Sequence, residues 1–199
     1  METIVPDSHR STTDNQSAVT PRDLKEYTLV LDLDETLVHC KYNESGSVVH
    51  FRPYLDDFLA AMVPLYNIVI FTAAAQDYAD LVLDNIDPQR AIFSKRLYRQ
   101  HTKNVNEEYN IKDLLIVTDN LEKTLIIDNI PENFMRQKNN GIFIKSWFDD
   151  QEDRELKRLI PLLKQIVDQK VPDVREFLQG LRNKLIEEIQ RGSINPTMI

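Results

Sequence analysis

Thr28-Leu-Val-Leu-Asp-Leu-Asp-Glu-Thr-Leu37 is the stretch that decides the fold of this 199-residue chain. Its apolar start predicts a buried strand, and the polar side chains of Asp32, Asp34 and Thr36 follow at the end of that strand. Because alternate residues of an extended chain point the same way, we expect the two carboxylates side by side, with α-carbons roughly 6–7 Å apart. Two neighbouring acids beside an apolar strand are costly unless a cation or a proton separates them.

Mg²⁺-dependent phosphoryl transfer needs such an arrangement, because one carboxylate attacks phosphorus, another handles the proton of the leaving group, and a metal neutralises charge. In this interpretation Asp32 is the nucleophile and Asp34 is the acid/base. The competing interpretation is an acidic turn between a strand and a helix, in which Asp34 or Thr36 is the N-cap.

Composition and charge narrow the class of protein. With 199 residues, 42% hydrophobic and 28% charged, the chain is long enough for one globular domain and a tail. The net charge of −8 argues against a nucleic-acid-binding surface across the domain, so we expect no direct nucleic-acid binding. Cys40 is the single cysteine, which excludes an intramolecular disulfide. No apolar stretch has the length of a membrane span, and we expect a soluble nuclear or cytoplasmic protein.

Strand-like and helix-like patterns alternate along the chain. Short apolar runs predict strands at residues 28–33, 67–72, 124–128 and 142–144, and apolar residues at helical spacing predict helices at residues 53–63, 76–86 and 152–167. This alternation predicts an α/β fold with a mostly parallel central sheet flanked by helices. Gly46, between two polar or β-branched stretches, predicts a small β-hairpin inserted after the first strand, at about residues 40–52.

The same patterns divide the chain into three parts. Residues 1–25 are polar and aperiodic, and we expect them to form a disordered leader before a domain at residues 26–170. Residues 171–199 are expected to form a helix that begins at Pro172 and a tail, both packed on the domain. A terminal helix that binds a partner is the alternative.

Further polar residues fall near the ends of other predicted strands, where ligands collect in parallel sheets. Thr72 could hold a phosphate oxygen, and Asp128 with Asn129 offers the oxygen ligands that a hard cation prefers. Lys112 is a candidate counter-charge for the phosphoryl group. Each residue is ambiguous alone, since such a threonine is often a cap, a lysine is often solvated, and an Asp-Asn pair is often a turn. Their order and placement together favour one site.

The chain resembles the FCP/SCP-type protein phosphatases, the polymerase C-terminal-domain phosphatase branch of the haloacid dehalogenase superfamily, over about residues 27–167. The motifs that carry the resemblance are Asp32-Leu-Asp-Glu-Thr-Leu-Val-His39, Arg52-Pro-Tyr-Leu-Asp-Asp-Phe58, Phe71-Thr-Ala73, Tyr98-Arg-Gln-His101, Lys112-Asp-Leu114, Ile127-Asp-Asn-Ile-Pro131 and Ser146-Trp-Phe148. Within this family, the Tyr98-Arg-Gln-His101 motif and a further stretch, Pro172-Asp-Val-Arg175, are most similar to the Dullard-type nuclear-envelope lipin phosphatases. Those proteins carry an N-terminal membrane segment, whereas we expect none here.

The resemblance implies a haloacid dehalogenase-like, Rossmann-related fold and a Mg²⁺-dependent Ser/Thr protein phosphatase that works through an aspartyl-phosphate. Asp34 would protonate the serine oxygen and then activate the hydrolytic water. The implied site consists of the metal ligands Asp32, Asp34 (through its backbone carbonyl) and Asn129, with Asp128 as a close partner, the phosphate-binding residues Thr72, Ala73 and Lys112, and the substrate-binding residues Arg99 and Thr36.

The leading functional hypothesis is therefore dephosphorylation of Ser or Thr in an extended phosphopeptide. The RNA polymerase II C-terminal domain is one candidate substrate, and a regulatory partner is a further candidate ligand. Two alternatives stay open: a small-molecule phosphatase, because a short hairpin covers less of the cleft, and a catalytically weak scaffold that binds partners. Arg52 belongs either to a positive rim with Lys41 and Arg99 or to a pair with a neighbouring acid.

Overall fold

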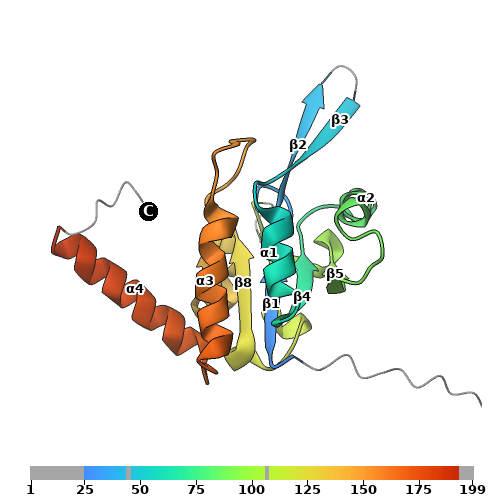
Figure 1. Cartoon of the computed structure of the whole chain (residues 1–199). Coiled ribbons are helices and arrows are strands. Elements are labelled where there is room, and N and C mark those ends of the chain that lie inside the picture. Colours follow the sequence, from blue (N-terminus) through green and yellow to red (C-terminus); the bar gives the residue numbers. More distant parts are fainter. Residues whose placement is uncertain (1–24, 44–45, 106–107, 193–199) are drawn as a thin grey trace, which may run out of the picture.

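A parallel sheet of five strands lies at the centre of the molecule, with the strand order β5-β4-β1-β8-β9 (Figure 1). The computed structural model describes residues 25–43, 46–105 and 108–192, and the predicted leader lies outside them except for residue 25. The strands are β1 (Tyr27–Leu31), β4 (Tyr66–Phe71), β5 (Phe93–Leu97), β8 (Thr124–Asp128) and β9 (Gly141–Phe143). The predicted α/β fold is confirmed. The chain reaches β4 and β5 on one side of β1 and β8 and β9 on the other, so a crevice opens at the carboxyl end of β1.

Both faces of the sheet are buried because successive residues of each strand enter two different apolar cores. Leu29 and Leu31 of β1 pack under the helices α1 (Leu55–Met62), α2 (Gln76–Ile86) and α3 (Glu155–Asp168), of which α1 and α3 lie side by side in Figure 1. Val30 faces the other core, which is covered by the 3₁₀ turns η2 (Leu114–Ile116) and η4 (Pro131–Asn140). This double burial explains why β1 reads as an apolar run and not as an alternating pattern.

The predicted hairpin is formed by the antiparallel strands β2 (Val38–Asn43) and β3 (Gly46–Phe51). It extends beyond the carboxyl ends of the sheet strands (Figure 1). A second small ribbon, β6 (Lys103–Val105) and β7 (Tyr109–Ile111), follows the 3₁₀ turn η1 (Arg99–His101), and η3 (Leu121–Lys123) precedes β8. Two β-ribbons therefore branch from the chain around the same end of the sheet.

Several elements depart from the predicted bounds for local reasons. The first helix begins at Leu55 and not at residue 53, because Tyr54 takes a left-handed conformation with φ of 65°. The last helix begins at Val174, because Asp173 caps it by accepting a hydrogen bond from the backbone N–H of Arg175. Strand β5 was not predicted, since Ser94 and Lys95 are exposed at the sheet edge and leave no apolar run.

Helix α4 (Val174–Gln190) leaves the domain at an angle, and its far half extends away from it (Figure 1). Val174 and Leu178 are buried in the core, whereas Ile186 is exposed. Arg182 donates a hydrogen bond to the carbonyl oxygen of Gly141 in β9. Across the described residues, we find no helix with the length and apolar content that a bilayer span needs.

The sheet's far edge depends on the small size of Gly141. A Cβ at this position would lie 2.1 Å from a ring carbon of Phe134, which is itself packed in the second core. We therefore expect Gly141→Ala to lower the free energy of unfolding by about 1–3 kcal/mol through overpacking. Chemical denaturation followed by circular dichroism measures this.

Gly180 supplies the matched control, because a Cβ there would meet nothing within 4 Å and the residue lies inside α4. Gly180→Ala is expected to raise the free energy of unfolding by about 0.5–1 kcal/mol, since alanine loses less backbone entropy in a helix. Equal stability of the two variants would contradict the steric argument.

Candidate active site

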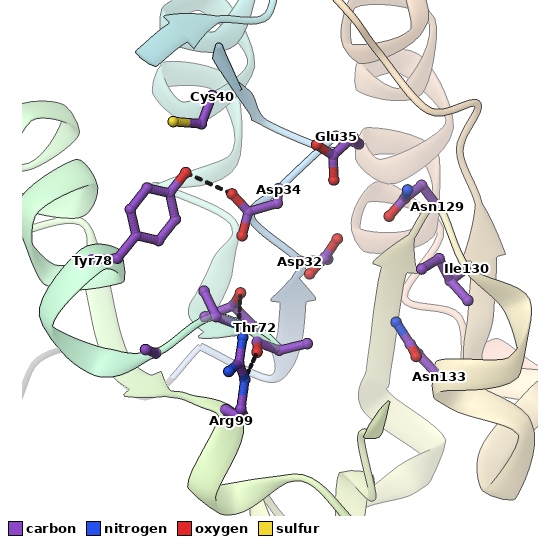
Figure 2. A pocket seen from close by; sticks show the side chains of 13 residues that line it. Asp32, Asp34, Glu35, Cys40, Thr72, Tyr78, Arg99, Asn129, Ile130 and Asn133 are labelled. Carbon is purple, nitrogen blue, oxygen red and sulfur yellow. Dashed lines mark hydrogen bonds between the residues drawn. The ribbon is translucent and has the colours of Figure 1, made fainter. Parts of the chain in front are cut away.

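A cleft of about 480 Å³ opens at the carboxyl ends of β1, β4 and β8 (Figure 2). The residues that line it come from the β1–β2 loop, the hairpin, the β4–α2 segment, η1 and the segment after β8. They are Asp32, Asp34, Glu35, Cys40, Thr72, Ala73, Ala74, Ala75, Tyr78, Arg99, Asn129, Ile130 and Asn133. Six of the predicted site residues, Asp32, Asp34, Thr72, Ala73, Arg99 and Asn129, are among these lining residues.

Lys112 joins the carboxyl ends of β1 and β8. Its ammonium is fully buried and donates to Asp32 Oδ1 at 2.5 Å and to Asp128 Oδ2 at 2.6 Å. Burial opposes the charge of Lys112, but the two carboxylates outweigh it and raise the pKa of Lys112. Burial and the nearby charge of Asp32 raise the pKa of Asp128, because one ammonium cannot neutralise two carboxylates. The trio therefore keeps an excess of negative charge.

Asp128 and Lys112 support the cleft from behind and do not line it. Both side chains are completely buried, and Asp128 also accepts hydrogen bonds from the backbone N–H of Ile130 at 2.8 Å and from Asn133 at 3.2 Å. The backbone N–H of Lys112 donates to the carbonyl of Asn133 at 2.6 Å, which fixes the loop that carries the lysine. Both carboxylate oxygens of Asp128 are therefore already engaged by groups of the fold.

Thr36 lies behind Asp32, and this corrects the prediction that Thr36 contacts the substrate. Its side chain is fully buried, and its hydroxyl donates to Asp32 Oδ2 at 2.9 Å and lies 3.3 Å from Asn129 Oδ1. The side-chain amide of Asn129 in turn donates to Ser146 Oγ at 2.9 Å. Thr36 therefore orients the Asp32 carboxylate, and Ser146 fixes which way the Asn129 amide faces.

Asp34 points away from Asp32, so the two carboxylates diverge and are not side by side as predicted. Figure 2 shows Asp34 directed towards Tyr78, whose hydroxyl donates to Asp34 Oδ1 at 2.7 Å. Burial raises the pKa of Asp34 to about 6 against the opposing effect of the Tyr78 hydrogen bond, and the charges of Asp32 and Glu35 add to the rise. A turn follows, with Glu35 at a positive φ of 55°, and the chain enters β2. The competing N-cap interpretation is wrong, because no helix begins there.

The opposite wall of the cleft is built from the end of β4 and from η1. Thr72 directly follows β4, and its hydroxyl accepts a hydrogen bond from the backbone N–H of Ala74 at 3.0 Å. Arg99 is exposed, and its Nε donates to the carbonyl of Ala73 at 2.6 Å while its backbone N–H donates to the carbonyl of Ala74 at 3.0 Å. This wall presents one guanidinium to the cleft.

Arg52 is paired and buried, which decides between the two interpretations of this residue. Its guanidinium donates to both carboxylate oxygens of Asp153 at 2.8 Å, to the carbonyl of Thr36 at 3.0 Å and to the carbonyl of Lys145 at 2.8 Å. Lys41 forms an ion pair with Asp149 on the hairpin's other side. The predicted positive rim is thus reduced to Arg99.

Sequence reasoning missed several residues that shape the cleft. Tyr78 and Cys40 are not among the predicted site residues, yet Tyr78 holds Asp34 and Cys40 lines the cleft. The signal for Tyr78 was its place in the first turn of the helix that follows Thr72, the predicted phosphate-binding threonine. Nothing in the local sequence pointed to Ser146 as the partner of Asn129.

The cleft offers oxygen donors suited to a hard cation. Among the described residues there is no group of three or more His, Cys, Asp and Glu side chains that could hold a metal. A set that mixes one carboxylate, Asp32 Oδ2, with the amide oxygen of Asn129 and the backbone carbonyl of Asp34 fits Mg²⁺ chemistry. The first two oxygens both lie within hydrogen-bond distance of the Thr36 hydroxyl, next to the excess negative charge.

Comparison with known proteins gives consistent matches. A family model described as "NLI interacting factor-like phosphatase" matches residues 27–175. "Probable C-terminal domain small phosphatase" from Dictyostelium discoideum is 42% identical, over 82% of this chain and 57% of that protein. "CTD nuclear envelope phosphatase 1B" from Danio rerio is 36% identical, over 71% of this chain and 67% of that protein. The chain thus spans little more than half the length of the first of these relatives.

A solved structure shares the fold. "The Structure of Fcp1, an essential RNA polymerase II CTD phosphatase" superposes with a TM-score of 0.69 at 18% sequence identity, and the match covers 82% of this chain and 72% of that one. At this identity the likeness concerns the arrangement of strands and helices alone.

The bond network of Arg52 leads to a stability prediction. Arg52→Met leaves the buried Asp153 carboxylate without its partner and frees the carbonyls of Thr36 and Lys145. We expect the free energy of unfolding to fall by about 3–5 kcal/mol. Urea denaturation measures the change.

Arg158→Met is the matched control, because its ion pair with Glu155 is exposed on α3. Its expected effect is below about 1 kcal/mol. If both variants lose the same small amount, Arg52 does not brace the loop that follows β1.

Proposed function

Because the chain belongs to the NLI interacting factor-like phosphatase family, we propose that it is a Mg²⁺-dependent protein serine/threonine phosphatase that works through an aspartyl-phosphate on Asp32. The observation that carries the proposal is the contrast between two acids in one cleft. Asp32 is held by Lys112 and Thr36, whereas Asp34 is held by Tyr78 and has a raised pKa. Two carboxyl groups in such different surroundings suit a nucleophile and an acid/base.

In the first step, Asp32 attacks phosphorus and a new bond forms between its carboxylate and the phosphoryl group. The bond from phosphorus to the serine or threonine oxygen breaks, and Asp34 supplies the proton that this oxygen needs to leave. In the second step, Asp34 accepts a proton from water as that water attacks phosphorus, so that Asp32 is released together with inorganic phosphate. A pKa of about 6 lets Asp34 serve in both directions near neutral pH.

The remaining cleft residues bind and orient. Thr72, Ala73 and the backbone around them would receive phosphoryl oxygens, with Lys112 supplying positive charge beside Asp32. Asp32, the backbone carbonyl of Asp34 and Asn129 would hold Mg²⁺, which when bound neutralises the charge shared by the nucleophile and the phosphate. Tyr78 keeps the Asp34 carboxyl at its place in the cleft.

The proposed substrate is a phosphorylated Ser or Thr in an extended peptide. The cleft is open between the hairpin and Arg99, and the exposed guanidinium suits a phosphopeptide. A human relative is named "Carboxy-terminal domain RNA polymerase II polypeptide A small phosphatase 2", and the solved structure with the same fold is called an RNA polymerase II CTD phosphatase. The name of the relative supports the C-terminal domain of RNA polymerase II as one candidate substrate. The predicted nuclear or cytoplasmic location and the absence of direct nucleic-acid binding stay predictions.

The nucleophile assignment is tested with Asp32→Asn. The variant keeps the size of the side chain but lacks the carboxylate that attacks phosphorus, so we expect phosphate release from a generic aryl phosphate and from a phosphoserine peptide to fall more than about 10³-fold. A chelator is expected to abolish wild-type activity in the same assay. Continuous measurement of released phosphate with added Mg²⁺ provides the readout.

Asp119→Asn serves as the control, because Asp119 is exposed and precedes β8 at the opposite end of the strand from the cleft. Wild-type turnover by Asp32→Asn would refute the proposed mechanism. Equal kcat/KM for sugar phosphates and phosphopeptides would favour the small-molecule alternative, and an inert wild-type protein would favour the scaffold.

The contact from Asn129 to Ser146 leads to a prediction about metal affinity. Ser146→Ala removes the acceptor of the Asn129 amide N–H, so the amide can turn its oxygen away from Asp32. We expect Mg²⁺ affinity, measured by isothermal titration calorimetry, to fall about 10- to 100-fold. Ser146→Thr keeps the hydroxyl and is expected to bind as the wild type does. Identical titrations for the alanine and threonine variants would show that Ser146 does not orient Asn129.

A further inference from the structure

The β2–β3 hairpin presents two faces, and only one of them belongs to the cleft. Cys40 faces the cleft near Tyr78 (Figure 2). Because successive residues of a strand point to opposite sides, His39 and Lys41 project from the back. His50 of β3 pairs directly with His39 across the hairpin and therefore shares the back face.

One residue of the segment after β9 reaches both strands of this back face. Asp149 forms an ion pair with Lys41 of β2, and its Oδ1 lies 3.2 Å from Nδ1 of His50 in β3. Beside it, the ring of Phe148 meets the ring of His39 edge-on, with centroids 5.4 Å apart. A single carboxylate thus ties the two strands to one point outside the cleft.

The backbone at Asp149 is unusual for its residue type. Its φ of 86° lies in the left-handed region, which side chains other than glycine rarely adopt. Such a conformation persists when surrounding contacts fix it. Here the carboxylate also accepts a hydrogen bond from the side chain of Gln151 at 2.9 Å, so three side chains converge on it.

The segment that carries Asp149 is itself fastened to the loop that carries the two proposed catalytic acids. The backbone N–H of Trp147 donates to the carbonyl of Glu35 at 2.9 Å, and the indole is buried with its N–H on the carbonyl of Asp150 at 2.8 Å. The position of Asp149 relative to Asp32 and Asp34 is therefore set by the fold. The position of the hairpin relative to the same acids then depends on Asp149.

We propose that Asp149 is a positioning residue for the phosphopeptide: it holds the hairpin from behind, so that the cleft face of the hairpin is placed to contact the peptide on either side of the phosphoresidue. This inference rests on the proposed phosphatase function and adds to it a determinant of substrate class. A small phosphate ester occupies only the floor of the cleft and does not need the hairpin. An extended peptide does need it, so Asp149 favours peptides over small esters.

The test compares Asp149→Asn with Asp150→Asn in the full chain. Asp150 is the adjacent acid, it is exposed, and its carboxylate accepts only from the backbone N–H of Glu152 among its described contacts. For Asp149→Asn we expect the KM of a phosphoserine peptide to rise about 3- to 10-fold with kcat unchanged, because the partly exposed ion pair with Lys41 is lost and the contact with His50 is weakened. Both constants for an aryl phosphate are expected to stay at wild-type values. Asp150→Asn is expected to leave all four constants unchanged.

Hydrogen exchange provides a readout that does not depend on turnover. Amides of residues 38–43 and 46–51 are expected to exchange faster in Asp149→Asn, while those of β1 keep their protection. Added salt is expected to raise the peptide KM of the wild type more than that of Asp149→Asn, since the ion pair with Lys41 is already absent in the variant while Arg99 faces the peptide in both.

Three outcomes would overturn the inference. An unchanged peptide KM would show that the hairpin needs no such anchor. A parallel fall of kcat for both substrates would make Asp149 a structural support of the catalytic loop. Unaltered exchange in the hairpin would remove the proposed cause. A wild-type protein without activity on either ester would instead refute the phosphatase function, and a wild type active on the aryl phosphate alone would refute the peptide assignment.

Discussion

The buried ammonium of Lys112 is the interaction on which the site depends. Asp32 and Asp128 end neighbouring parallel strands, and two carboxylates buried this close would repel one another without a cation between them. Lys112 supplies that cation from a loop whose backbone is bonded to Asn133. Because a lysine balances only one of the two acids, the site remains attractive to a further positive ion.

The two oxygens of Asp32 have separate neighbours, and this separation organises the cleft. Oδ1 accepts a hydrogen bond from the ammonium of Lys112, and Oδ2 accepts one from the hydroxyl of Thr36, which also lies next to the amide oxygen of Asn129. A cation at Oδ2 and a phosphoryl group near Lys112 would therefore approach Asp32 from different sides. Asp34, turned away towards Tyr78, stays free of both and keeps a carboxyl that can exchange a proton.

The sequence predicted those parts of the site that follow from strand ends, and it failed where distant contacts decide. Asp32, Thr72 and Asn129 come directly after the strands β1, β4 and β8, and in a parallel sheet such ends must meet. The direction of a side chain, in contrast, depends on contacts with residues that are distant in the sequence. Thr36 was expected to face the substrate, but the turn at Glu35 buries it behind Asp32. Strand β5 escaped prediction because its exposed edge residues break the apolar pattern.

The segment after β9 shows why such contacts matter, because it has no regular structure and yet determines the position of two elements. Through Lys145 and Asp153 it holds Arg52, and with it the loop that follows β1. The contacts are a buried salt bridge and a charge-assisted hydrogen bond, whose loss costs about 3–5 kcal/mol. Through Asp149 it holds the hairpin by a partly exposed ion pair with Lys41 and a contact with His50, each contributing less than about 1 kcal/mol. The loop that follows β1 is thus held more firmly than the hairpin. Under the proposed function, substitutions on the hairpin would alter which peptide binds without disturbing Asp32 and Asp34.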